Sequence, residues 1–129
     1  MKLLNGYTSD LHRLRDTSAE AYIENLLVRR AVERTLHLAI EASLGIGQHI
    51  IASEGYRTPM ANRDVFVVLN EEGLIPADLL PALIQMARFR NLIVHDYATI
   101  DNLAVHEILQ NRLGDFDRFA QAIVAYLER

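Results

Sequence analysis

The stretch from Arg90 to Tyr97, RNLIVHDY, places an arginine, an amide, a histidine, a carboxylate and a phenol around three apolar residues. Arg90 is a permanent cation, His95 titrates near neutral pH, and Asn91 offers an amide. On an ideal helix Asn91 and His95 lie one turn apart on one face, whereas Arg90 and His95 differ by roughly 140°. Arg90 and His95 therefore converge only if the arginine reaches round on its long stem, if the helix ends near His95, or if a second subunit completes the site.

An arginine together with a histidine suits acid–base chemistry at a phosphodiester. Arginine presents a fork that matches two phosphate oxygens, and histidine can take or give a proton during phosphoryl transfer. Cleavage of RNA by its own 2′-hydroxyl needs a base, an acid and a group that stabilises the crowded phosphorane, but no metal ion. Arg90 and His95 are therefore candidate catalytic residues, and Asn91 would fix the imidazole tautomer or hold the phosphate. The alternative for His95 is a structural role beside an apolar run.

The sequence lacks the other common signatures of catalysis and binding. Its five histidines include no pair at the i, i+4 spacing of a helical zinc site, and the absence of cysteine excludes disulfides and thiolate metal sites. The six glycines are scattered and form no phosphate-binding P-loop, and no G-x-S-x-G elbow presents a nucleophilic serine. We predict no metal ion and no bound cofactor.

The composition is that of one soluble domain spanning residues 1–129. Half of the residues are apolar and 23% are charged, as in an ordinary globular protein. The formal net charge of −4 argues against nucleic-acid binding over the whole surface, but it leaves room for a local basic cleft. No signal peptide and no run near the ~20 apolar residues of a membrane span are present, so we expect a cytoplasmic protein without a membrane partner.

Hydrophobic periodicity predicts an all-α, up-and-down bundle of four to five helices with short connections. The β-branched run at 65–68 would fit a strand locally, but an isolated strand would have no partner in this chain. The first two expected helices cover about 3–15 and about 19–52, and the third runs from a cap at Asn62 to a stop at Gly73. The fourth starts after Pro76 or at Pro81 and carries the segment from Arg90 to Tyr97. The last one runs from 101 or 102 to about 127.

A polar line follows the long second helix at steps of four, three and four residues: Arg30, Arg34, His37 and Glu41. One interpretation is a solvated face on which Arg34 and Glu41 form part of a charge network. The other is a polar seam directed into a cleft, where it would support the key segment. The candidates for lining that cleft are Arg30, Arg34 and Glu41 from this line, together with Arg88.

The motif Arg90-Asn91-x-x-x-His95-x-Tyr97 resembles the R-N-x-x-x-H-x-Y signature of HepT-like proteins. These proteins are the toxin half of toxin–antitoxin pairs formed by a HEPN domain and a minimal nucleotidyltransferase. The resemblance extends over most of the chain, including the long second helix around 30–42, the approach to the motif at 86–91 and the final helix at 108–115.

The resemblance implies a helical bundle that forms a homodimer, with the arginine–histidine motifs of both subunits along one interfacial cleft. It implies a metal-independent ribonuclease with Arg90 and His95 in the catalytic positions. It also implies a partner antitoxin, a minimal nucleotidyltransferase, which silences the toxin by transferring AMP to Tyr97. A bulky anionic nucleotide beside Arg90 would occupy the site meant for an RNA phosphate.

Two positions depart from the family pattern, because Ile40 and Arg88 stand where family members often have glycine. Ile40 would hold a neighbouring helix farther away, and Arg88 adds charge near the cleft. The alternative function is a non-catalytic helical adaptor or nucleotide-binding module for a nucleotidyltransferase, with Arg90 as a phosphate anchor. A purely structural bundle is a third reading. The adaptor would form a complex with the nucleotidyltransferase but cut no RNA.

Overall fold

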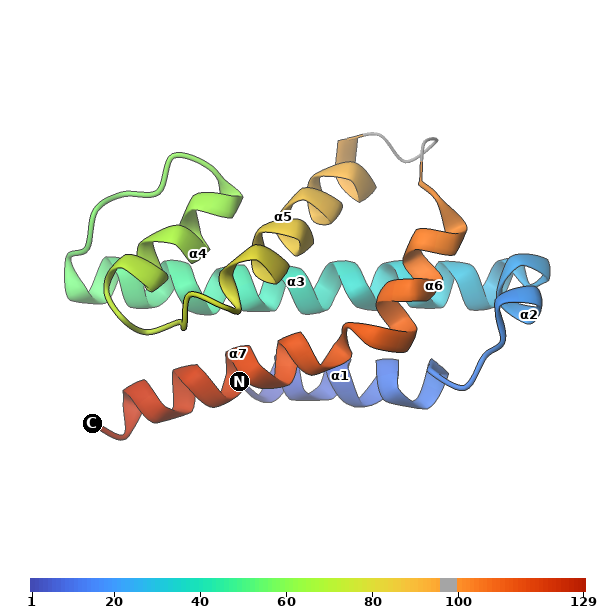
Figure 1. The fold of residues 1–129 in the computed structure, drawn as a ribbon, viewed down its shortest axis with the longest axis horizontal. Helices are drawn as coiled ribbons and strands as arrows, with labels where there is room; N and C mark the ends of the chain where they lie inside the picture. The colour runs from blue at the N-terminus through green and yellow to red at the C-terminus, as the bar shows by residue number, and fades with distance from the viewer. Residues whose placement is uncertain (96–99) are drawn as a thin grey trace.

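The computed structural model describes residues 1–95 and 100–129, and every regular element in this part of the chain is an α-helix (Figure 1). The prediction of an all-α fold is confirmed. The described helices number seven, more than the expected four to five, because two of the predicted helices are each divided in two. They are α1 (Lys2–Leu14), α2 (Ala19–Glu24), α3 (Leu26–Glu54), α4 (Asn62–Glu71), α5 (Leu80–His95), α6 (Asn102–Asn111) and α7 (Leu113–Leu127).

The predicted helix over 19–52 is broken at Asn25. This residue has an extended backbone (φ −105°, ψ 99°), and its side-chain oxygen accepts a hydrogen bond from the amide of Val28, 3.1 Å away. An asparagine that caps a new helix in this way competes with continuation of the old one. The prediction of a single helix here was therefore wrong, although α3 alone still spans 29 residues.

The predicted C-terminal helix is broken at Arg112, where φ is −116° and ψ is 1°. Two poor helix formers, Asn111 and Gly114, flank the break. The turn gives α6 and α7 different directions while both keep their apolar stripes buried, through Val105 and Leu109 on α6 and through Leu113, Phe116, Phe119 and Ile123 on α7.

The long helix α3 is the axis of the molecule. Figure 1 shows α1 and α7 side by side along one edge of α3, and α4 and α5 along the other, with α5 inclined across it. The start of α5 at Leu80 places Pro81 in the first helical turn, where a missing amide hydrogen costs no hydrogen bond. Within the described residues, no helix combines the length and the apolar character needed to cross a bilayer.

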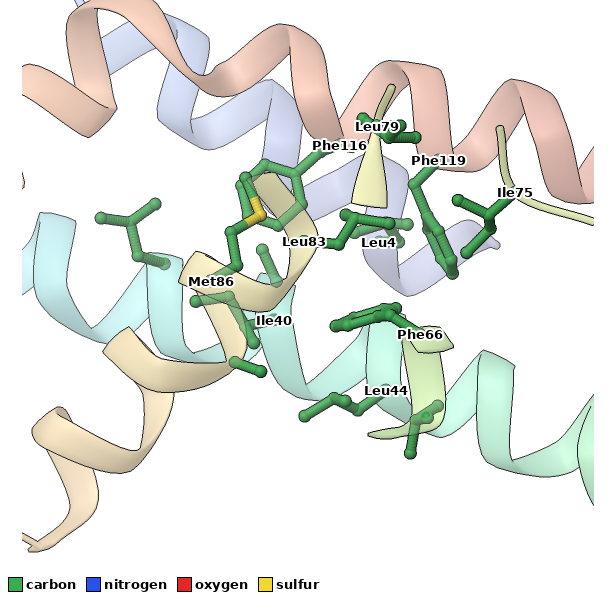
Figure 2. Close-up of a cluster of buried hydrophobic side chains, with 14 of the residues drawn as sticks. Leu4, Ile40, Leu44, Phe66, Ile75, Leu79, Leu83, Met86, Phe116 and Phe119 are labelled. Atoms are coloured by element: carbon green, nitrogen blue, oxygen red, sulfur yellow. The ribbon is translucent and has the colours of Figure 1, made fainter. Parts of the chain in front are cut away.

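The core lies between α3, α5 and α7, with contributions from α1 and α4 (Figure 2). Leu83 and Met86 of α5 lie between Ile40 of α3 and Phe116 of α7. Ile40 is only 1% exposed, so the bulk that it adds where family members often have glycine is taken up inside this chain's own core. Burying such side chains is the main source of stability for the bundle.

Gly47 of α3 lies in close contact with α4. A Cβ atom at Gly47 would lie 2.7 Å from Cγ1 of Val65 and 3.0 Å from Cδ1 of Leu69. Only a residue without a side chain fits this contact. The close packing fixes α4, whose first residue reaches the site described next.

Candidate active site

Arg90 points from α5 toward α3, where it pairs with Glu41. Its Nε–H donates to Oε1 of Glu41, and its Nη1 donates to Oδ1 of Asn91, 3.2 Å away. The Arg90 side chain is 22% exposed, so the guanidinium is held in place but is still open to solvent on one side. No hydrogen bond joins Nη2 of Arg90 to another of the described residues, and this nitrogen carries two hydrogens that can be donated.

Glu41 is held in turn by His37, one turn earlier on α3. Nε2 of His37 lies 3.4 Å from Oε1 of Glu41, and Nδ1 of the same ring lies 3.4 Å from Nη1 of Arg34. Because a guanidinium can only donate, Nδ1 of His37 is the acceptor and Nε2 carries the hydrogen that faces Glu41. On α3, a series of polar contacts thus leads from Arg34 through His37 and Glu41 to Arg90, and its outer members are open to solvent, with Arg34 exposed and the Glu41 side chain 39% exposed.

A third helix contributes Asn62. Its Nδ2 donates to Oδ1 of Asn91 at 3.2 Å, the same oxygen that accepts from Arg90. The prediction that Asn62 caps its helix was wrong, since the N-cap of α4 is Ala61 and Asn62 is the first helical residue. An asparagine at a helix start has the sequence signature of a cap, so nothing in the sequence separated the two uses.

His95 is the last residue of α5 and is exposed. Along a regular helix it points roughly 140° away from Arg90. Among the described residues no hydrogen bond joins the two side chains. The described part of α5 runs as far as His95, and Arg90 turns toward α3 and not toward His95.

The remaining predicted residues lie at different places. Arg34 belongs to the seam, whereas Arg30, one turn earlier, pairs through Nη1 with Oε2 of the buried Glu33 at 3.1 Å. Arg88 is on the opposite side of α5 from Arg90, where it lines a groove shared with α6 and α7. Tyr97, the predicted modification site, lies outside the described residues.

Another histidine that could have been a metal ligand is instead held by contacts within the chain. His106 of α6 shares a hydrogen bond of 2.7 Å with the carbonyl oxygen of Thr17, and its ring packs against Tyr22 with 5.6 Å between the centroids. It fastens α6 to the turn that precedes α2. No three histidine, aspartate or glutamate side chains within 1–95 and 100–129 gather closely enough to hold a metal ion together.

The charges of the seam are suited to one anion. Arg34 and Arg90 bring two positive charges, and Glu41 brings one negative charge, so the cluster has a net charge of about +1 with His37 neutral. Glu41 accepts a hydrogen bond from Nε of Arg90 and Asn91 accepts one from Nη1, and the two bonds together fix the plane of the guanidinium. A fixed fork with donors to spare binds phosphate oxygens at a lower entropic cost than a mobile one.

Comparisons with known proteins point to one family. The family model described as "Ribonuclease HepT-like" matches residues 4–123. An mRNA nuclease HepT of Shewanella oneidensis is 30% identical over 102 residues, which is 79% of this chain and 77% of that protein.

Two solved structures share the fold. One is a crystal structure of a toxin–antitoxin with AMP-PNP, whose matching chain superposes with a TM-score of 0.84 at 26% identity, over 96% of this chain and 92% of that one. The other is a tri-AMPylated Shewanella oneidensis HEPN toxin in complex with MNT antitoxin, with a TM-score of 0.81 at 24% identity, over 97% and 98% of the two chains. With the family model covering nearly all of the sequence, this chain belongs to the HepT-like ribonuclease family.

Proposed function

We propose that this chain is the toxin of a toxin–antitoxin pair and that it cleaves RNA through Arg90 and His95 without a metal ion. The observation that carries the proposal is the guanidinium of Arg90, which is fixed by Glu41 and Asn91 with donors left for a phosphate. It acts as a single domain over residues 1–129 in the cytoplasm.

In this mechanism His95 removes the proton from the 2′-hydroxyl beside the scissile phosphate. The 2′-oxygen then attacks phosphorus, and Arg90 stabilises the negative charge that accumulates on the phosphorane oxygens. The bond to the 5′-oxygen breaks, and that oxygen takes a proton from a second acid. The products are a 2′,3′-cyclic phosphate and a 5′-hydroxyl.

The divergence of Arg90 and His95 is a reason to propose a homodimer, with a water molecule as the second acid. The two side chains diverge by roughly 140° around α5, so one copy does not bring them together at one phosphate. A twofold partner that packs along α5 supplies the missing group, because a twofold axis gives the same contact twice. Arg90 of one copy then faces the partner's His95 across the cleft, and each site needs one arginine and one histidine.

The test is cleavage of labelled RNA by the purified protein in an excess of chelator. We expect the wild-type protein to cut RNA and His95→Ala to lose activity by at least a hundredfold, the usual contribution of a general acid or base. His49→Ala is the matched control, since His49 is an exposed histidine of α3. Equal cleavage by the wild-type protein and His95→Ala would refute the role of His95. A tight complex with the nucleotidyltransferase and no cleavage in any reaction would instead indicate the adaptor.

The antitoxin in this proposal is a minimal nucleotidyltransferase that transfers AMP to Tyr97. Support comes from the related Shewanella toxin, which is described as tri-AMPylated and in complex with MNT antitoxin. After incubation with the partner enzyme and ATP, we expect the intact mass to rise by one or more adenylyl groups and RNA cleavage to stop. Tyr97→Phe should keep its mass and its activity. An unchanged mass of the wild-type protein would count against this part of the proposal.

A further inference from the structure

A groove of about 950 Å³ opens between α5, α6 and the first turns of α7. It lies on the side of α5 that is turned away from Arg90, and neither the catalytic chemistry nor the seam of α3 uses it. Its apolar lining comes from Met86, Phe89 and Leu92 of α5 and from Ile108 of α6. The volume is at the upper end of the range in which proteins bind small organic molecules.

Most of the charged side chains at this groove are already paired. Oδ2 of Asp78 accepts from Nη2 of Arg118 at 2.8 Å, and Oε1 of Glu107 lies 3.8 Å from Nε of Arg112. Arg88 and Asp115 also line the groove, and neither forms an ion pair with another described residue. Counted over residues 1–95 and 100–129, the lining thus has one cation and one carboxylate without an ion pair, with apolar surface beside them.

Asp115 is in an unusual state for a carboxylate. Its Oδ2 is buried and has no hydrogen-bond partner among the described residues, and burial raises the pKa of this carboxyl while Arg112 and Arg118 oppose the rise. A buried acceptor without a donor is unfavourable. Asp115 also lines the groove, so a ligand there that brings an N–H group to its carboxyl supplies a donor to a group that lacks one.

Two of the residues that line the groove lie on the same stripe of α5 as His95. Arg88, Leu92 and His95 are spaced by four and three residues, so the three side chains leave the helix within about 60° of one another. His95 continues the stripe that Arg88 and Leu92 present to the groove. A strand bound at His95 that runs back along α5 would pass directly over Leu92.

We propose that this groove binds a nucleotide of the RNA next to the one cut at His95. The base lies against Phe89 and Leu92 and donates an amino hydrogen to Asp115, and the phosphate binds Arg88. A nucleotide has all three features, because it combines a flat apolar body with an N–H donor at one end and an anion at the other. An anion alone would bind Arg88 but leave the carboxyl of Asp115 without a donor. An apolar ligand would leave both Arg88 and Asp115 without a partner. The proposal rests on the function proposed above, and makes Asp115 a residue that selects the base.

The test measures binding of four 2′-O-methyl oligonucleotides, each built from one base, which cannot be cut because the attacking hydroxyl is blocked. A base contact and a phosphate contact should behave differently. We expect Asp115→Asn to change the order of preference among the four bases, with a loss of about tenfold for the favoured one. Arg88→Ala should weaken all four by a similar factor. The matched controls are Asp117→Asn, exposed on the same helix, and Arg63→Ala, exposed on α4. Circular dichroism and melting temperature establish that each variant is folded.

The result that overturns the proposal is also specific. If Asp115→Asn and Arg88→Ala bind all four oligonucleotides like the wild-type protein while RNA cleavage is intact, the groove does not hold the substrate and the proposed function still stands. If AMP alone binds with the same sensitivity to both variants and the oligonucleotides do not, the groove serves a free nucleotide. If a protein partner protects the groove and RNA does not, it is a docking surface. Absence of cleavage by the wild-type protein would instead refute the proposed function itself.

Discussion

At the scale of single residues, the position of Arg90 depends on one acceptor from another helix and one from its own helix. Glu41 of α3 accepts from Nε, and Asn91, which accepts from Nη1, is itself held by Asn62 of α4. An arginine on an exposed helix end would otherwise sample many rotamers. Its usefulness for binding a phosphate in the transition state therefore depends on side chains that need not touch the substrate.

Replacement of Glu41 by glutamine tests this dependence. Glu41→Gln keeps the shape of the acceptor but removes the charge, so we expect kcat for RNA cleavage to fall by about ten- to a hundredfold with little change in KM. The melting temperature should change by no more than about 2 °C, because Glu41 is 39% exposed and such partly exposed pairs contribute little to stability. Steady-state kinetics on a labelled oligonucleotide measure both constants.

The control for this variant is Glu72→Gln, which makes the same chemical change at an exposed position after α4. Full activity of Glu41→Gln would mean that Arg90 is positioned without the charge of Glu41. A loss confined to KM would mean that Glu41 affects substrate binding and not the chemical step.

At the scale of helices, the site depends on α4 lying close enough to α5 for Asn62 to reach Asn91. Gly47 makes this possible, because a Cβ atom there would lie 2.7 Å from Cγ1 of Val65. Val65 is buried and β-branched, so it cannot turn aside easily. The contact is therefore a packing constraint and not a consequence of helix propensity.

We expect Gly47→Ala to lower the free energy of unfolding by about 1–2 kcal/mol, since overpacking of about 1–3 kcal/mol outweighs a gain in helix propensity of at most about 1 kcal/mol. Gly45→Ala is the matched control, because nothing lies within 4 Å of a Cβ atom at Gly45. That variant should be more stable than the wild-type protein by about 0.5–1 kcal/mol. Urea unfolding measures both, and equal stabilisation by the two alanines would show that α4 moves away at little cost.

The loop before α4 is fastened by Arg57, which bonds Asp64 through two hydrogen bonds of 2.8 Å and Glu71 through two of 2.9 Å. These bonds lower the pKa of Asp64 to about 2 and also lower the pKa of Glu71. Because both carboxyls have a lower pKa in the folded chain than in the unfolded one, their contribution is complete above about pH 5 and is lost as the pH falls from about 4 to 2.

The corresponding prediction concerns unfolding in urea at pH 5, 4 and 3. The wild-type protein should lose stability over this range by more than Arg57→Ala, and the difference should be small because Arg57 is 43% exposed and solvent weakens the pair. Arg63→Ala, a nearby exposed arginine, should follow the wild-type protein. Parallel curves for the wild-type protein and Arg57→Ala would contradict the assignment.

At this scale, helical periodicity in the sequence predicts which segments are helical but not where one helix ends and the next begins. The pattern predicted an all-α chain, because apolar stripes recur every three or four residues throughout. The breaks at Asn25 and Arg112 were not predicted, since apolar residues continue at helical spacing on both sides of each. The breaks are revealed only by the capping bond of Asn25 and the backbone angles of Arg112.

At the scale of the whole molecule, the sequence identified the two candidate catalytic residues but not their mutual arrangement. Spacing by five residues on one helix separates them in angle, and in the structure Arg90 turns toward α3 while His95 ends α5 on another side. A single copy of the chain therefore contains both groups without forming one site from them. In the arrangement proposed above, the site forms between chains, so the proposal has to be tested on the assembly and not on a single chain.

Mixing of subunits tests it directly. If each site combines Arg90 of one copy with the partner's His95, a mixed dimer of Arg90→Ala and His95→Ala contains one intact site and one doubly defective site. Random reassortment of equal amounts makes half of the dimers mixed, so about a quarter of the wild-type activity should return from two inactive proteins. If the site forms within one chain, no activity returns.

The control is the double variant Arg90→Ala/His95→Ala mixed with the wild-type protein. If sites form between chains, the mixed dimers of this control are inactive. If sites form within one chain, these mixed dimers keep half of the activity. Cleavage assays after denaturation and joint refolding distinguish the two cases, because they require opposite results from the two mixtures.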